Sequence, residues 1–168
     1  MDFYELVNKR FSYRGYINKP VEQNKLEYIL ECSALAPSAK NEQPWKIYIV
    51  QSDEVKEKLY EAYPRDWLKE APIIVVFVGL EGKHWVRSDG KSYLMCDVTI
   101  ITDYFILAAT EQGLGTCYIA AFDEEKVKAA LNLPDNEKPF LMTPLGYPKP
   151  DSKRERKRKS LSEIVVYV

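Results

Sequence analysis

The chain has 168 residues, of which 46% are apolar and 29% are charged, and its net charge is -1. This length suits one domain that buries roughly 70% of its unfolded surface, and the composition excludes a disordered or fibrous protein. Unbroken apolar runs such as residues 73–78 are far shorter than the roughly 20 residues that cross a bilayer, and residues 1–10 include several charged side chains. We therefore expect a single cytoplasmic domain over residues 1–168, without signal peptide or membrane partner.

The first half of the chain predicts helices around an early strand and a buried strand. Helices are expected over residues 2–9, 21–35 and 53–63, and a strand over residues 46–50. In the first helix, Phe3 lies on the apolar face. Residues 73–79 form an apolar, β-branched run bounded by Pro72 and Gly79. Such a run is typical of a central strand that is covered on both faces.

The second half predicts a buried helix followed by shorter elements. Residues 91–112 follow a helical pattern with apolar side chains on nearly all sides, and Gly113 suits the helix end. A helix with no solvent-exposed face must pack against other elements on every side. A partner chain would supply part of this packing. Strands are expected over residues 116–121 and 140–144, and a helix over residues 123–131. The apolar end, residues 163–168, predicts a strand that pairs with the sheet of the other protomer.

Nucleophilic and metal-dependent catalysis have little support in the residues. Cys32, Cys96 and Cys117 fit neither a disulfide framework nor a zinc motif, and we interpret them as buried thiols. His84 is the only histidine, so a Cys–His or Ser–His pair has one candidate base. The scattered carboxylates form no ligand cluster. We therefore expect no metal and no catalytic side chain.

Two glycine-containing segments fail the tests for nucleotide-binding loops. Residues 113–118 begin like a dinucleotide fingerprint, but Tyr118 occupies the third glycine position and no helix follows directly. Residues 90–92 are similar to the end of a phosphate-binding loop, but Trp85 stands where its first glycine belongs.

Basic residues are concentrated near the end of the chain. Residues 153–159 carry six basic side chains and one acidic one, so the remainder has a net charge of -6. A run of this kind is typical of a solvated surface or of a nucleic-acid contact. Because the remainder is acidic and has no base-stacking motif, we expect no nucleic-acid partner.

A candidate phosphate site begins with Arg10, Ser12 and Arg14. A phosphate monoester needs several donors and compensating charge, and arginine provides both. Taken alone, the triplet is more typical of a polar helix end. Three further segments follow in chain order: Pro-Ser-Ala-Lys-Asn-Glu-Gln-Pro-Trp at 37–45, Gly-Leu-Gly-Thr-Cys-Tyr-Ile-Ala-Ala-Phe at 113–122, and Pro-Leu-Gly-Tyr-Pro at 144–148 ahead of Arg156 and Arg158. Together the four segments resemble the nitroreductase family over nearly the whole chain.

The resemblance implies an α+β fold with three layers, α/β/α, around a central mixed, mainly antiparallel sheet. It implies a homodimer with a buried central helix and exchanged C-terminal strands. It also implies FMN at the dimer interface. By likeness, Arg10 and Ser12 contact the phosphate and ribityl chain, and Arg14 contacts the pyrimidine end of the ring.

The remaining segments add contacts to the same cofactor. Pro37, Ser38 and Asn41 correspond to residues that cover the FMN bound mainly by the other subunit. The backbone N–H groups near Ala120 and Ala121 correspond to donors that face flavin N5 and O4. Arg156 and Arg158 complete the phosphate site. The chain departs from the family pattern in two places. Where some members have an asparagine and a lysine before the central strand, this chain has residues 64–72, in which Arg65 could take that role, and the substrate-side insertion is reduced to residues 80–90.

The implied activity is that of an FMN-dependent oxidoreductase. By a ping-pong mechanism, NAD(P)H would reduce the flavin and a small acceptor such as a nitroaromatic or a quinone would then be reduced. Because the cofactor carries the redox chemistry, a chain without a nucleophilic side chain can still be an enzyme of this kind. The alternative is a non-catalytic flavin-binding protein, a sensor or store. Trp67, His84 and Trp85 are either substrate contacts at the opening or ordinary loop side chains.

Overall fold

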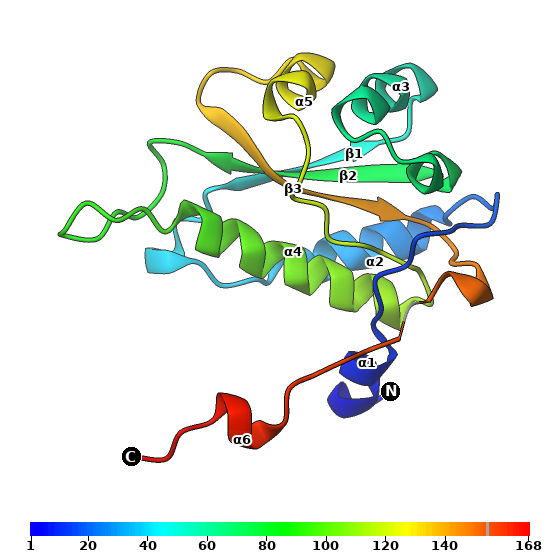
Figure 1. The fold of residues 1–168 in the computed structure, drawn as a ribbon. Coiled ribbons are helices and arrows are strands. Elements are labelled where there is room, and N and C mark those ends of the chain that lie inside the picture. The colour runs from blue at the N-terminus through cyan, green and yellow to red at the C-terminus, as the bar shows by residue number, and fades with distance from the viewer. Residues whose placement is uncertain (154) are drawn as a thin grey trace.

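The computed structural model describes residues 1–153 and 155–168. Its centre is an antiparallel sheet of three strands in the order β1 (Trp45–Val50), β2 (Ile73–Leu80) and β3 (Glu137–Leu145). In the register, Trp45 lies opposite Gly79 and Ile73 opposite Leu145. Every residue of β2 except the last is buried, so the predicted central strand is confirmed (Figure 1).

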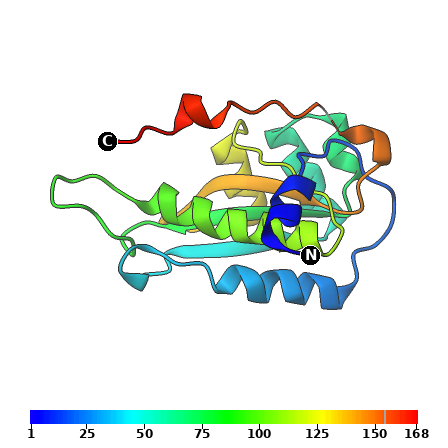
Figure 2. The same ribbon diagram turned by 90° about the horizontal axis from the view of Figure 1, so that it is seen from below.

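Helices cover both faces of this sheet. One face carries α2 (Gln23–Ala34) and α4 (Leu94–Glu111), and the other carries α3 (Asp53–Ala62) and α5 (Glu124–Leu131) (Figures 1 and 2). Because side chains alternate along a strand, β2 supplies both cores. Val75 and Phe77 face the first pair of helices, whereas Val76 and Val78 face the second. The three-layer α/β/α architecture is confirmed.

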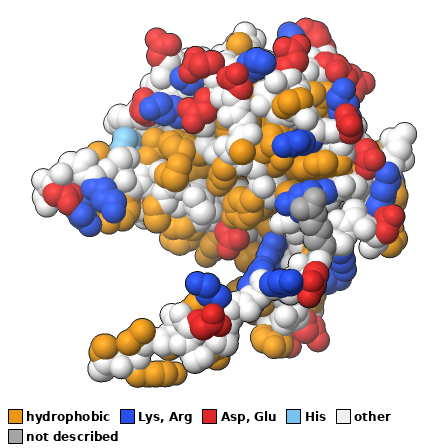
Figure 3. Space-filling view, viewed as in Figure 1, with side chains coloured by type: hydrophobic (Ala, Val, Ile, Leu, Met, Phe, Trp, Pro, Cys, Tyr) orange, Lys and Arg blue, Asp and Glu red, His pale blue; other side chains and the backbone are white. Residues whose placement is uncertain are grey.

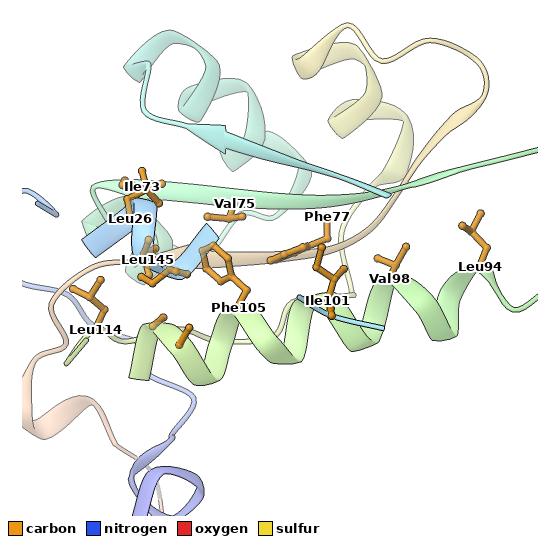
Figure 4. Packing of buried hydrophobic residues seen from close by; sticks show 14 residues of the cluster. Leu26, Ile73, Val75, Phe77, Leu94, Val98, Ile101, Phe105, Leu114 and Leu145 are labelled. Carbon is orange, nitrogen blue, oxygen red and sulfur yellow. The ribbon is translucent and has the colours of Figure 1, made fainter. Parts of the chain in front are cut away.

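The larger core lies between the sheet and α4. Phe77 of β2 meets Phe105 of α4 edge to face, with ring centroids 5.3 Å apart and planes at 79° (Figure 4). Val98 and Ile101 continue the same buried stripe. This packing fixes the direction of α4 along the sheet. The segments near the two ends of α4 contain the residues of the candidate site.

The remaining elements are short. They are α1 (Phe3–Lys9), α6 (Leu161–Ile164), and the 3-10 turns η1 (Ala39–Asn41), η2 (Asp66–Glu70) and η3 (Pro150–Ser152). The α4 helix begins three residues later than predicted, because Val86 and Ser92 form a bridge that closes a small loop before it. No helix in the described part of the chain has both the length and the apolarity needed to span a membrane.

The prediction of a strand over residues 116–121 was wrong. The segment makes only isolated bridges, because its neighbours change along its length: Thr116 pairs with Ser12, whereas Ile119 pairs with Met142. No continuous ladder can form with partners that change after a few residues. The bridge between Ser12 and Thr116 is parallel, and it is the one parallel pairing among the described residues.

The chain end does not join its own sheet. Instead of a strand from residue 163, Ser160 and Glu163 form a capping box that starts α6, and residues 165–168 extend beyond it in exposed positions. The tail projects away from the body of the molecule (Figures 1 and 3). A serine with glutamate three residues later favours a helix start, which explains the difference from the prediction.

Several apolar side chains are exposed where burial was expected. Cys117 is buried, but Cys32 is only half-buried and Cys96 is exposed on α4, so the interpretation of three buried thiols was wrong for Cys96. Met95 and Tyr104 on the same helix are also exposed, as is Phe3 on α1. In the single chain, α4 therefore has one face without cover.

Candidate functional site

A cavity of about 250 Å³ lies where the segment after α1 meets the C-terminal tail. Its lining residues are Arg10, Phe11, Ser12, Arg14, Glu155, Arg156 and Arg158. Five of the ten residues predicted from the sequence thus line one cavity, although more than 140 residues separate the two segments. Figure 3 shows lysine and arginine side chains gathered where the tail meets the body.

The first wall of the cavity is an extended segment. The α1 helix ends at Lys9, and the Arg10 N–H donates to the Leu6 carbonyl oxygen at 3.0 Å. The chain is then held against residue 116, because the Tyr13 N–H donates to the Thr116 carbonyl oxygen at 2.9 Å. Arg10, Ser12 and Arg14 line the cavity together with the Phe11 ring, while Tyr13 is buried.

The second wall is the tail, which two contacts of Arg156 hold in place. The Arg156 guanidinium donates to the carbonyl oxygen of Arg10, and its central carbon lies 4.1 Å from the centroid of the Phe11 ring. Lys153 lies 5.0 Å from the same ring. The tail thus meets the segment after α1 through cations on an aromatic ring.

The cavity carries uncompensated positive charge. Of the arginines in the described ranges, only Arg87 forms a salt bridge, and Glu155 at the cavity pairs with Lys157 at 3.6 Å. Burial lowers the pKa of Arg156, and the neighbouring charges of Arg10 and Arg158 lower it further. Guanidinium groups that repel one another in this way are suited to an anion with several acceptor oxygens.

A second group of predicted residues lies elsewhere, in the loop between α2 and β1. Pro37, Ser38 and Asn41 belong to a tight turn in which Lys40, Asn41 and Gln43 all have positive φ, at 51°, 57° and 49°. Hydrogen bonds hold this shape: the Gln43 N–H donates to Ser38 Oγ at 2.8 Å, and Gln43 Nε2 donates to Asn41 Oδ1 at 3.1 Å. The loop is therefore ordered by its own polar side chains.

A buried carboxylate attaches this loop to α4. Asp97 is only 2% exposed, and its Oδ1 accepts from the Ala39 N–H at 2.9 Å. Its Oδ2 is buried and has no hydrogen-bond partner among the described residues. Sequence reasoning missed Asp97. The available signal was an acidic residue three positions after Leu94, on the apolar stripe of the predicted helix.

The two groups lie at opposite ends of α4 (Figures 1 and 2). Asp97 in the first turn holds the 37–41 loop, whereas residues 10–14 lie against Thr116, just beyond the last turn. An α-helix of 18 residues is about 27 Å long. Within one chain, Pro37, Ser38 and Asn41 therefore do not line the arginine cavity.

Ala120 and Ala121 lie on an exposed segment between these ends. Ile119 pairs with Met142 of β3, after which both alanines are exposed. Neither backbone N–H donates a hydrogen bond within residues 1–153 and 155–168. Two small residues with free donors thus lie on the surface beside β3.

The other sequence candidates lie outside the arginine cavity. Arg65 is exposed and lines a separate surface hollow with Tyr60 and Lys69. Trp67 packs edge-on against Tyr63, with ring centroids 6.0 Å apart, and Trp85 lies 4.9 Å from Tyr93. His84 lines a second cavity of about 430 Å³, together with Leu94, Lys138 and Phe140.

Comparison with known proteins finds one family. The model described as "Nitroreductase family" matches residues 7–70 and 60–147. The curated NADH dehydrogenase of Thermus thermophilus is 30% identical over 179 residues, with 83% of each chain covered. Iodotyrosine deiodinase 1 of Sus scrofa is 28% identical over 200 residues, covering 99% of this chain and 68% of that protein. The crystal structure of a nitroreductase family protein from Clostridium difficile superposes with a TM-score of 0.92 at 35% identity, covering 99% of this chain and 98% of the other.

Proposed function

The chain belongs to the nitroreductase family of oxidoreductases, and we propose that it binds FMN and transfers reducing equivalents from NAD(P)H to a small acceptor. The observation that carries the proposal is the cavity in which Arg10, Arg14, Arg156 and Arg158 meet without carboxylate partners in the described part of the chain. A phosphate monoester supplies negative charge and several acceptor oxygens for these four guanidinium groups.

The chain's own residues have distinct tasks in this proposal. Arg10, Arg156 and Arg158 bind the phosphate with Ser12. Arg14 would lie at the pyrimidine end, where its positive charge would favour the reduced, more negative form of the cofactor. The N–H groups of Ala120 and Ala121 offer unpaired donors to the ring, and their small side chains allow close approach. Bound FMN supplies the chemistry of hydride acceptance and electron transfer.

A homodimer is part of the proposal. The 37–41 loop and the arginine cavity lie at opposite ends of α4, so both can contact one FMN only if the loop belongs to a second chain. Ser38 and Asn41 of the partner subunit then cover the ring, together with Pro37 of the partner subunit.

Exposed surface supports such an assembly. The single chain exposes 9985 Å², whereas a folded monomer of 19.5 kDa exposes roughly 8,500 Å². The excess includes Met95 and Tyr104 on α4 and the apolar tail residues Leu161, Ile164 and Val166. A large exposed apolar patch is typical of an interaction surface, and a second copy provides matching patches.

The decisive test is the visible absorbance spectrum of the purified protein, recorded before and after addition of FMN and then of NADH or NADPH without oxygen. Flavin bands that bleach with a nicotinamide support the proposed reductase. Bands that persist with both nicotinamides favour the alternative, a flavin-binding protein without this activity. A protein that stays colourless and binds no FMN would contradict the proposal.

The acceptor is tested after this first step, with a panel of candidate compounds. The relatives carry the names NADH dehydrogenase and iodotyrosine deiodinase, so the panel should contain a quinone, a nitroaromatic and an iodotyrosine. The expected result is oxygen-free turnover of NAD(P)H that requires one of these acceptors. Bleaching without turnover of any of them would reject the acceptor classes named here.

A further inference from the structure

Phe11 lies in the middle of the arginine segment, yet the proposed function gives it no task. Its ring is half-buried and packs beside Tyr13, with ring centroids 6.3 Å apart, and against the small core that contains Tyr16. The Arg156 guanidinium covers it, with the central carbon 4.1 Å from the ring centroid, and Lys153 approaches to 5.0 Å. The ring thus joins the body of the domain to the tail.

The position of Arg156 needs such a partner. Arg10 and Arg158 repel it, which lowers the pKa of Arg156 in addition to the effect of burial. In the described residues its one hydrogen bond is to the Arg10 carbonyl oxygen, and that bond brings it closer to a like charge. A guanidinium within about 6 Å of an aromatic face is attracted by the ring quadrupole, and this attraction opposes the repulsion without neutralising the charge.

We propose that Phe11 is a positioning residue, which holds the Arg156 guanidinium at the phosphate cavity before the ligand binds and so ties the C-terminal tail to the segment after α1. The inference rests on the proposed function, since the ligand is taken to be FMN. Holding a long side chain in its bound position lowers the ordering cost of binding. A carboxylate could also hold Arg156, but it would consume the charge that the phosphate requires.

The proposal makes the aromatic character of Phe11 the important property. Leucine at this position still fills the contact with Tyr13 and Tyr16 but presents no ring quadrupole to Arg156. Tyrosine keeps the ring face. Phe11→Leu should therefore affect ligands that carry a phosphate, whereas Phe11→Tyr should behave like the unaltered protein.

The experiment measures dissociation constants for FMN and for riboflavin, which lacks the phosphate, by flavin fluorescence titration. The proteins are the unaltered chain, Phe11→Leu, Phe11→Tyr, Arg156→Ala and the Phe11→Leu, Arg156→Ala double variant. We expect Phe11→Leu to weaken FMN binding about three- to tenfold, with riboflavin changed less than about twofold. In the Arg156→Ala background, Phe11→Leu should have no further effect on FMN. Phe3→Leu, the same change at an exposed ring on α1, serves as matched control and should leave both affinities unchanged.

Three results would overturn the inference. Equal losses for FMN and riboflavin would show that Phe11 acts only by packing. An unchanged FMN affinity in Phe11→Leu, or a full effect of Phe11→Leu in the absence of Arg156, would show that the ring does not act through that guanidinium. Failure of the unaltered protein to bind FMN would instead reject the proposed function itself, and the inference with it.

Discussion

Single polar residues decide the shape of the loops around this domain. Asp97 is the best example, because its buried carboxylate reaches out of α4 to the backbone of a loop almost 60 residues earlier. The connection between α2 and β1 contains three residues other than glycine with positive φ. This backbone conformation costs energy at each of the three positions. Such a loop keeps its shape only while the surrounding hydrogen bonds hold it.

The first prediction concerns this carboxylate. Asp97→Ala removes the acceptor for the Ala39 N–H and should lower the free energy of unfolding by about 1–3 kcal/mol. Asp97→Asn keeps an amide oxygen at the same place and should recover most of the loss. Urea denaturation of the three proteins measures the difference. Equal stability of Asp97→Ala and the unaltered protein would show that the hydrogen bond from the Ala39 N–H to this carboxylate does not stabilise the fold.

The second prediction is a pH dependence at Glu22. The Tyr147 hydroxyl donates to its carboxylate at 2.5 Å and Lys19 lies at 3.3 Å. The hydrogen bond from Tyr147 is the largest cause that lowers the pKa of Glu22 from 4.5 to about 2. A folded-state pKa below the unfolded one adds stability that is complete above about pH 4.5 and disappears as the pH falls towards 2.

Glu22→Gln removes this contribution. The stability difference between the unaltered protein and Glu22→Gln should therefore be constant from pH 7 to pH 5 and should shrink between pH 4.5 and pH 2. Thermal unfolding across that range measures it. A difference that stays constant down to pH 2 would contradict the assignment of the low pKa to Glu22.

At the scale of elements, the end of α4 shows how local sequence sets a boundary. Gly113 has a φ of +76°, its N–H donates to the Thr110 carbonyl oxygen at 3.1 Å, and the Leu114 N–H donates to the Ala109 carbonyl oxygen at 2.9 Å. This is a Schellman motif, in which glycine avoids the strain of the left-handed conformation. The turn sends the chain back towards residues 10–14.

The third prediction tests this helix end. A Cβ at residue 113 would meet no atom within 4 Å, so Gly113→Ala should cause no steric clash. Alanine is strained in the left-handed conformation, and this strain should lower the free energy of unfolding by about 1–2 kcal/mol. Gly113→Asn should lose less, because asparagine adopts this conformation more readily. Urea denaturation gives both values. Equal losses in the two variants would imply a steric cause instead.

At the scale of the whole molecule, the outstanding feature is apolar surface that the single chain leaves exposed. The tail after residue 160 contains Leu161, Ile164 and Tyr167, all exposed, and it projects away from the domain (Figure 3). The charged segment just before it contains Arg156 and Arg158, which line the arginine cavity. The tail thus joins the proposed cofactor site to the proposed dimer contact.

The fourth prediction separates these two tasks. Truncation after Ser160 keeps the cavity arginines but removes the apolar end, so the proposed dimer should dissociate at micromolar concentration while the fold of the domain remains. Sedimentation velocity measures the mass, and far-UV circular dichroism checks the fold. A truncated protein that stays as tightly dimeric as the complete one would show that the tail is not needed for association.

Much of the architecture could be read from the residues alone. The apolar run 73–79 predicted a strand covered on both faces, and α4 followed from its apolar periodicity, since burial patterns repeat with the period of the element. The arginine segments at both ends of the chain could also be recognised. On residue chemistry alone the first of them was more typical of a polar helix end, and the prediction of a phosphate site followed from the resemblance of all four segments to the nitroreductase family.

Which of these residues contact one another depends on the folded chain. Sequence spacing does not show that Arg156 rests on Phe11, that Asp97 holds the 37–41 loop, or that residues 116–121 change partners too often to form a strand. Each of these depends on contacts between segments far apart in the chain. The residues alone predict the buried central strand, the apolar helix and the distribution of charge, because burial period and side-chain chemistry are local properties. The structure decided the cavity and the separation of the two site groups, because those follow from how α4 lies across the sheet.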